Sequence, residues 1–94
     1  MYKSNIEGAL CYEVKTYRYT VAGRTMAEFE ILLFENGQIG SQGKIIESGE
    51  GFSPGKVYPT VEEAVQEIIN MIERKIIDND WVQKTIKYSK KIKY

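Results

Sequence analysis

The 94-residue sequence predicts a single α+β domain in which an antiparallel sheet of about four to five strands packs on one amphipathic helix, residues 60–77. Three observations lead to this fold class. Residues 10–34 hold two strand-like segments, residues 35–56 hold six of the eight glycines, and residues 61–77 carry the apolar spacing of a helix. A chain of this length has room for one hydrophobic core, so we expect one domain over residues 1–94.

The segment LCYEVKTYRYTV, residues 10–21, is rich in aromatic and β-branched residues and predicts a strand. Its apolar residues change phase halfway along. They are Leu10, Tyr12 and Val14 in the first half and Tyr17, Tyr19 and Val21 in the second. If both sets face the core, the strand needs a bulge near Lys15 or Thr16.

A glycine turn, AGRT at residues 22–25, leads into a second strand, MAEFEILLF. In that strand Ala27, Phe29 and Ile31 alternate with Glu28 and Glu30, so we expect a hairpin partner with one face on the core and one in water. The next 22 residues, 35–56, are too rich in glycine for a long helix. Asn36-Gly37 predicts a turn there, and residues 44–47 predict a short strand.

Residues 61–77, VEEAVQEIINMIERKII, repeat apolar residues at i, i+3, i+4 and i+7, which predicts an amphipathic helix. Thr60 followed by Glu63 forms a capping box. Glu62 and Glu63 suit the positive end of the helix dipole, and Arg74 and Lys75 suit the negative end.

The last segment, WVQKTIKYSKKIKY at residues 81–94, alternates weakly and is interpreted as a lysine-rich closing edge strand or tail. Lysines on an edge strand would discourage edge-to-edge aggregation, which is a structural reason for their presence. Charge gives a second reading. Residues 1–80 hold all 13 acids and 8 of the 13 bases, a net charge of −5, whereas residues 81–94 carry five lysines and no acid. Such asymmetry also marks contact with nucleic acid or another acidic surface.

Catalysis is not expected from this composition. The chain has no histidine, which removes the commonest general base and every imidazole metal site. The lone Cys11 excludes an internal disulfide, and Gly43-Lys44 is followed by Ile45 rather than the Ser or Thr of a phosphate-binding loop. We therefore expect no enzyme, no metal and no cofactor. The N-terminal segment has no signal peptide or membrane span, so we expect a cytoplasmic protein without a membrane partner.

Three stretches in order resemble the WGR domain, a small module named for a Trp-Gly-Arg triplet and found in several poly(ADP-ribose) polymerases. FEILLFENGQIGSQGK resembles the strand and motif segment, PTVEEAVQEIINMIERK the following helix with Ala64 at its small packing residue, and DNDWVQKTIKYSKKIKY the closing stretch. The resemblance covers residues 10–94 and implies a WGR-like fold. Asn36 and Gln38 stand where the family has Trp and Arg, so the stacking surface and guanidinium that such domains bring to a DNA end are missing.

Two functions fit these features. The first is a non-enzymatic module that contacts nucleic acid, DNA or RNA, through the basic C-terminal segment. Its candidate residues are Lys84, Lys87, Lys90, Lys91 and Lys93 for phosphates and Tyr88 and Tyr94 for stacking.

The second is a protein-binding inhibitor or adaptor from a phage or mobile element, which blocks a nucleic-acid-handling host protein such as a defence nuclease, as anti-CRISPR proteins do. Its candidate residues are Tyr17, Tyr19, Trp81, Asn36 and Gln38. Oligomeric state stays open, with a monomer slightly favoured, because a lysine-rich edge argues for a monomer while surface tyrosines allow pairing through the sheet.

Overall fold

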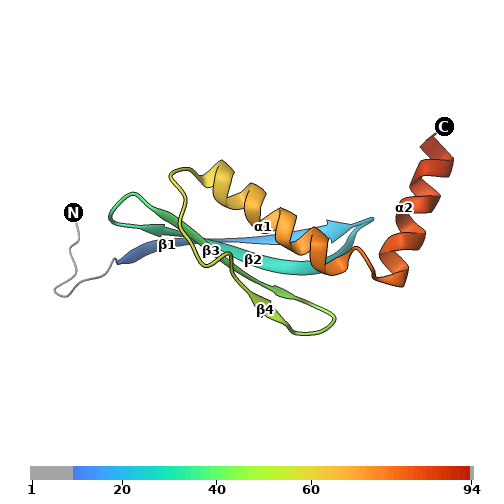
Figure 1. Cartoon of the computed structure of the whole chain (residues 1–94), viewed down its shortest axis with the longest axis horizontal. Coiled ribbons are helices and arrows are strands. Elements are labelled where there is room, and N and C mark those ends of the chain that lie inside the picture. The colour runs from blue at the N-terminus through green and yellow to red at the C-terminus, as the bar shows by residue number, and fades with distance from the viewer. Residues whose placement is uncertain (1–9, 94) are drawn as a thin grey trace.

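The structure is a computed structural model that describes the backbone of residues 10–93 and the side chains of residues 10–86. Four antiparallel strands form one sheet in the order β1-β2-β3-β4 (Figure 1). The elements are β1 Cys11–Val21, β2 Arg24–Phe34, β3 Ile39–Ile45, β4 Gly51–Phe52, α1 Val61–Ile76 and α2 Asp80–Lys93. The expectation of a small α+β domain is confirmed at this level, with a second helix in addition.

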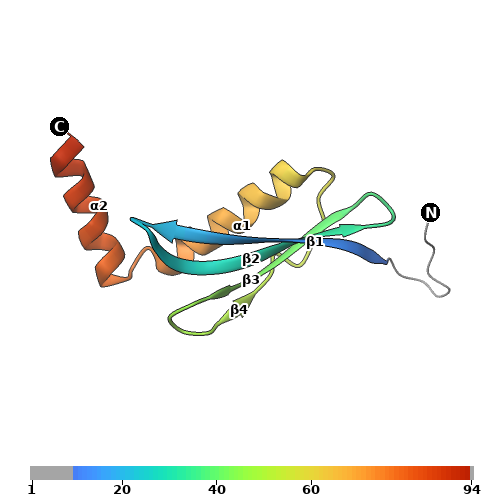
Figure 2. The same ribbon diagram turned by 180° about the vertical axis from the view of Figure 1, so that it is seen from behind.

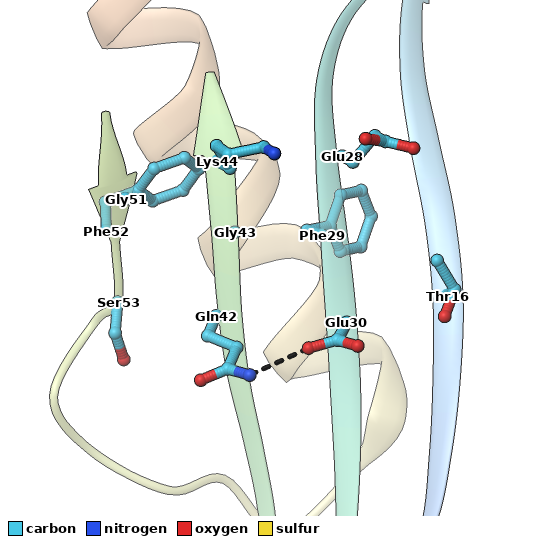
Figure 3. Close-up of a pocket in the computed structure, with 10 residues that line it drawn as sticks. All are labelled: Thr16, Glu28, Phe29, Glu30, Gln42, Gly43, Lys44, Gly51, Phe52 and Ser53. Carbon is cyan, nitrogen blue, oxygen red and sulfur yellow. Dashed lines mark hydrogen bonds between the residues drawn. The ribbon is translucent and has the colours of Figure 1, made fainter. Parts of the chain in front are cut away.

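The domain has two layers, because α1 runs along one face of the sheet. Seen from both sides, no described helix lies on the opposite face (Figures 1 and 2). Alternation along β2 explains this arrangement: Ala27, Phe29 and Ile31 are buried against α1, while Glu28 and Glu30 lie on the opposite, outer face (Figure 3). The predicted division of this strand into a core face and a wet face is confirmed.

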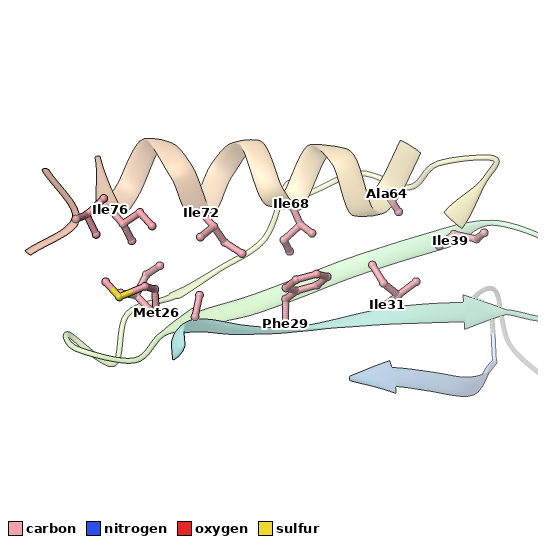
Figure 4. Packing of buried hydrophobic residues seen from close by; sticks show 11 residues of the cluster. Met26, Phe29, Ile31, Ile39, Ala64, Ile68, Ile72 and Ile76 are labelled. Atoms are coloured by element: carbon pink, nitrogen blue, oxygen red, sulfur yellow. The ribbon is translucent and has the colours of Figure 1, made fainter. Parts of the chain in front are cut away.

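The core lies between the inner face of the sheet and α1 (Figure 4). Helix α1 contributes one residue from each turn, at a spacing of four, to a buried ridge. The ridge consists of Ala64, Ile68, Ile72 and Ile76. Central strand β2 supplies the opposing surface, and Ile39 and Ile45 of β3 extend it. The inner face of the sheet is therefore shielded from water mainly by one helix, α1.

The predicted helix of residues 60–77 is confirmed, with Thr60 as its N-cap and Ile77 as its C-cap. The Glu63 N–H donates to Thr60 Oγ1 at 3.2 Å, and the Thr60 hydroxyl lies 3.3 Å from Glu63 Oε2. This bond satisfies one of the N–H groups that the first turn leaves unpaired. The acidic first turn and basic last turn follow the helix dipole as expected.

The β1–β2 hairpin turns on two residues with positive φ, Ala22 at 48° and Gly23 at 81°. Positive φ at both positions matches the right-handed twist of the strands it joins. The predicted bulge near Lys15 or Thr16 is wrong: the register shifts lie between Cys11 and Glu13 and between Tyr19 and Thr20. No bulge is needed in the middle, because Tyr17, Tyr19 and Val21 pack on the core whereas the earlier apolar residues are exposed.

Two further expectations need correction. The short strand predicted at residues 44–47 is the end of a longer one, β3, and residues 46–48 form a turn. The strand or tail predicted at residues 81–94 is a helix over Asp80–Lys93. Asn79 starts it, since the Val82 N–H donates to Asn79 Oδ1 at 3.1 Å, and Val82 and Ile86 are four apart, as helix packing requires. The lysines of this segment therefore do not protect a sheet edge.

A close approach in the sheet requires glycine at position 43. Gly43 pairs with Phe29 on one side and Phe52 on the other, and the Phe52 ring lies over the glycine. A Cβ at this position would come within 2.8 Å of Phe52 Cζ and 3.0 Å of both the Glu28 carbonyl and Phe29 Cβ. Phe52 thereby reaches the core from a strand of only two residues.

Shortening the isoleucine ridge should destabilise the whole domain. We expect Ile72→Ala to lower the free energy of unfolding by about 2–5 kcal/mol, because a side chain with no exposed surface leaves a cavity. Ile77→Ala, five residues further on at the C-cap and 45% exposed, should change it by only about 0.5 kcal/mol. Urea denaturation followed by circular dichroism measures both, and equal losses would contradict the assigned core.

Gly43→Ala should lower the free energy of unfolding by about 1–3 kcal/mol, because the added methyl group displaces the Phe52 ring or the β2 backbone. Gly51→Ala is the matched control in the adjoining strand, where the nearest atom to a new Cβ is 3.8 Å away. It should be nearly neutral. The same denaturation experiment compares the two, and a neutral Gly43→Ala would show that Phe52 does not close over the glycine.

Candidate functional site

Helix α2 begins on the domain and extends from one end of it (Figure 1). Val82 is buried at 3% exposure, and Trp81 and Ile86 pack against the edge of the core. The Arg24 guanidinium, at the start of β2, lies 4.9 Å from the centre of the Trp81 ring. Trp81 therefore has a structural contact at the joint between α2 and the sheet.

The Asn79 side chain connects this joint to the loop after β3. Its amide donates to Glu47 Oε2 at 2.8 Å while its carbonyl oxygen caps α2. Gln83 reinforces the joint, since its side-chain amide donates to the Ile77 carbonyl at the end of α1. In the sequence, the signal for this helix was Asn79, an N-cap residue that comes shortly before the apolar residues Trp81 and Val82.

The helix assembles the five candidate lysines into one element. Lys84 is exposed on the second turn. Positions 84, 87 and 91 are spaced three and four apart and so share one face of α2, over a rise of about 10 Å. Lys90, Lys93 and Tyr88 are further positions of the same helix, and Tyr94 lies outside the described residues. The five lysines of α2 face only one acid within the element, Asp80 at its first position.

Tyr17 and Tyr19 lie on the inner face of β1, at the border of the core. The Tyr17 ring stacks on Phe29 with centroids 5.0 Å apart and an interplanar angle of 7°. The Tyr19 hydroxyl donates to Glu73 Oε2 on α1 at 2.7 Å. Partial burial and the neighbouring carboxylate raise the pKa of Tyr19 to about 12. Both side chains fasten β1 to the rest of the fold.

Asn36 and Gln38 shape the turn between β2 and β3, which lies at the end of the molecule opposite α2 (Figure 1). The Gln38 N–H donates to Asn36 Oδ1 and the Asn36 amide donates to Gln38 Oε1, both at 3.0 Å. This is an Asx-type turn closed by its own side chains. The structure therefore does not bring the two motif positions together with Trp81 or with the lysines.

The outer face of the sheet carries an open hollow of about 760 Å³, lined by charged, polar and aromatic side chains (Figure 3). Gln42 donates to Glu30 Oε1 at 2.7 Å, and Arg18 lies 3.8 Å from Glu28 Oε2. Each carboxylate of this face thus has a polar or cationic neighbour. The hollow is open, and its lining combines the carboxylate, amide and amine groups of this face with the rings of Phe29 and Phe52.

Among residues 10–93, no three potential metal ligands lie together, and no helix is long and apolar enough to cross a membrane. Comparison of the chain with protein-family models, curated proteins and solved structures found no match. The case for a function therefore rests on the residues of this chain alone.

The Tyr19–Glu73 contact makes the free energy of unfolding depend on pH in the alkaline range. The raised pKa means that the unfolded chain loses the phenol proton near pH 10 and the folded chain near pH 12. The stabilising contribution of this contact to the free energy of unfolding is present below pH 10 and is lost as the pH rises toward 12. Tyr19→Phe should flatten that part of the pH profile of the free energy of unfolding. Tyr17→Phe, which also removes one phenol, should leave the decline in place, and identical profiles for both variants would contradict this assignment.

Proposed function

We propose that the protein is a non-enzymatic module that binds nucleic acid through the lysines of α2. The observation that carries this proposal is the placement of five lysines on a 14-residue helix at one end of the domain. A helix presents such side chains in successive turns, at a spacing suited to a row of phosphates. The remaining chain, residues 1–80, has a net charge of −5, which would orient the molecule with α2 toward a polyanion.

The base of α2 supports this role because it is held in place. Val82 and Trp81 anchor the first turn, and Asn79 and Gln83 bind it to the two neighbouring segments. A basic helix fixed at one end loses less conformational entropy on binding than a free lysine-rich tail would. Lys84, the lysine nearest this anchor, is already exposed to solvent.

A protein-binding inhibitor or adaptor is the second candidate, and one observation favours it. Among the described residues no element covers the outer face of the sheet, which holds the open hollow, and two exposed apolar residues, Tyr12 and Val14, lie at the start of its edge strand β1. In that case the partner would contact the outer face of the sheet. Changes at Tyr12 and Val14, rather than changes in α2, would then weaken binding.

Fluorescence anisotropy with labelled single-stranded DNA, duplex DNA, recessed-end DNA and RNA at several salt concentrations tests the first candidate. Each lysine that meets a phosphate should add about 0.7–0.9 to the slope of log K against log salt. Changing Lys84, Lys87 and Lys91 to Gln should reduce the slope by roughly two to three and weaken binding at low salt by at least about tenfold.

The matched control changes three exposed cationic residues outside α2, Lys44, Lys56 and Arg74, to Gln, which removes the same charge. It should keep most of the affinity and slope. Equal losses in both triple variants would show attraction to overall charge rather than a site on α2. No binding by the unchanged protein at low salt would overturn the proposal and direct the search to a protein partner.

A further inference from the structure

The two edges of the sheet differ in length. Strand β4, at one edge, has two residues and is followed closely by Pro54, so it offers little to pair with. Strand β1, at the other edge, has 11 residues, and only β2 pairs with it among the described residues. Its register is regular from Glu13 to Tyr19. Within residues 10–93, a strand of this length therefore has a row of main-chain groups along its outer side that no other strand pairs.

The hydrogen bonds of β2 identify those groups. The Met26 carbonyl accepts from the Ile46 N–H at 3.0 Å, and the Phe34 N–H donates to the Gln38 carbonyl at 3.1 Å. Even-numbered residues of β2 thus point their main-chain groups toward the β3 side, and odd-numbered residues point theirs toward β1.

The partners of those odd-numbered residues in β1 are Glu13, Lys15 and Tyr17. Their main-chain N–H and C=O groups hydrogen-bond to β2. Because the groups alternate along a strand, the intervening residues point theirs away from the sheet. Those residues are Val14, Thr16 and Arg18.

Exposed apolar side chains concentrate at the first half of the same strand. Leu10, Tyr12 and Val14 are 41%, 54% and 48% exposed, and they are half of the six large apolar residues with such exposure in the described chain. On the outer face Val14 pairs with Leu32, so the apolar surface continues into the sheet. Glu13 and Lys15, of opposite charge, stand on either side of Val14 and are exposed.

We propose that the β1 edge binds a second copy of this chain, antiparallel, with a two-fold axis at Val14. Residues that face each other across such an axis lie at equal distances from Val14 in sequence. Glu13 then faces the partner's Lys15, and Lys15 faces the partner's Glu13. The two Val14 side chains meet at the centre and join the two apolar surfaces. The two four-stranded sheets become one continuous sheet.

Neighbouring registers lack this complementarity. A two-fold axis at Lys15 would set that lysine against its own copy, which is unfavourable. An axis at Thr16 would set Glu13 against the partner's Tyr19 and Lys15 against the partner's Tyr17, so neither charge would be paired. The charges of Glu13 and Lys15 therefore favour this register over its neighbours. They also favour a second copy of the chain as partner, because an antiparallel copy sets a Lys opposite each Glu.

This dimer is independent of the proposed nucleic-acid site. Strand β1 ends near α2 and begins at the opposite end of the domain, so the axis at Val14 lies away from α2 (Figure 1). Antiparallel pairing would place the two α2 helices at the far ends of the joined sheet. Failure of nucleic-acid binding would leave the dimer intact, and loss of the dimer would leave α2 in place on each chain.

A charge swap tests the register by analytical ultracentrifugation. The unchanged protein should show a concentration-dependent monomer–dimer equilibrium. Glu13→Lys and Lys15→Glu should each raise the dimer dissociation constant by at least about tenfold, because each places like charges opposite one another. The double variant Glu13→Lys/Lys15→Glu restores opposite charges and should restore the dimer. A monomer at all concentrations up to about 1 mM, or two single variants that dimerise as well as the unchanged chain, would overturn the proposal.

Disulfide trapping gives a second readout, in a Cys11→Ser background. Val14→Cys should form a covalent dimer under mild oxidation, since residues facing each other in a hydrogen-bonded antiparallel pair have Cα atoms about 5.5 Å apart, within disulfide range. Thr16→Cys is the matched control, because its two copies would stand about 13 Å apart along the strands. A covalent dimer of Thr16→Cys but not of Val14→Cys would reject the Val14 axis.

Discussion

The packing of one isoleucine ridge on one strand supports the rest of this structure. Ile68 and Ile72 of α1 have no exposed surface, and they lie on the β2 residues Phe29 and Ile31. Burial of these side chains is the main stabilising contribution available to a chain of this size. Strand β2 takes part because it is central, with a neighbour on each side and an apolar inner face. Edge strand β1 attaches to it through hydrogen bonds and through Tyr17 on Phe29, whereas edge strand β4 pairs with β3 and reaches the core through Phe52.

In the described part of the chain a single helix covers the sheet, and no other element lies on its outer face or along the β1 edge. The outer face tolerates this because its acids have neighbouring cations or amides, as Glu28 has Arg18 and Glu30 has Gln42. The β1 edge tolerates it less well, since Val14 and Tyr12 are half exposed there. Such a strand pairs readily with another, and the charges beside Val14 limit the partners it can accept.

Helix α2 places a cluster of positive charge away from the hydrophobic core. Its first turn belongs to the domain through Val82 and Trp81, and its lysines belong to the segment that extends beyond. The acids of the chain all lie in residues 1–80, so the molecule carries opposite charge at its two parts while its net charge is zero. A polyanion would meet α2 first, which is the physical basis for the function proposed for it.

The sequence by itself determined the elements whose signals are local. Helix α1 was predictable from its apolar repeat and Thr60 cap, and the two faces of β2 from strict alternation, because both patterns report a single element against one core. Only the tertiary structure decided the C-terminal segment and the faces of β1. Weak alternation with a spacing of two or four fits a strand or a helix equally, and packing of Val82 and Trp81 with the Asn79 cap selected the helix. The apolar residues of β1 looked alike, but the unbroken pairing with β2 from Glu13 to Tyr19 puts them on opposite faces of the sheet. Tyr17 therefore packs on the core beside Phe29, and Val14 is exposed on the outer face, which α1 does not cover.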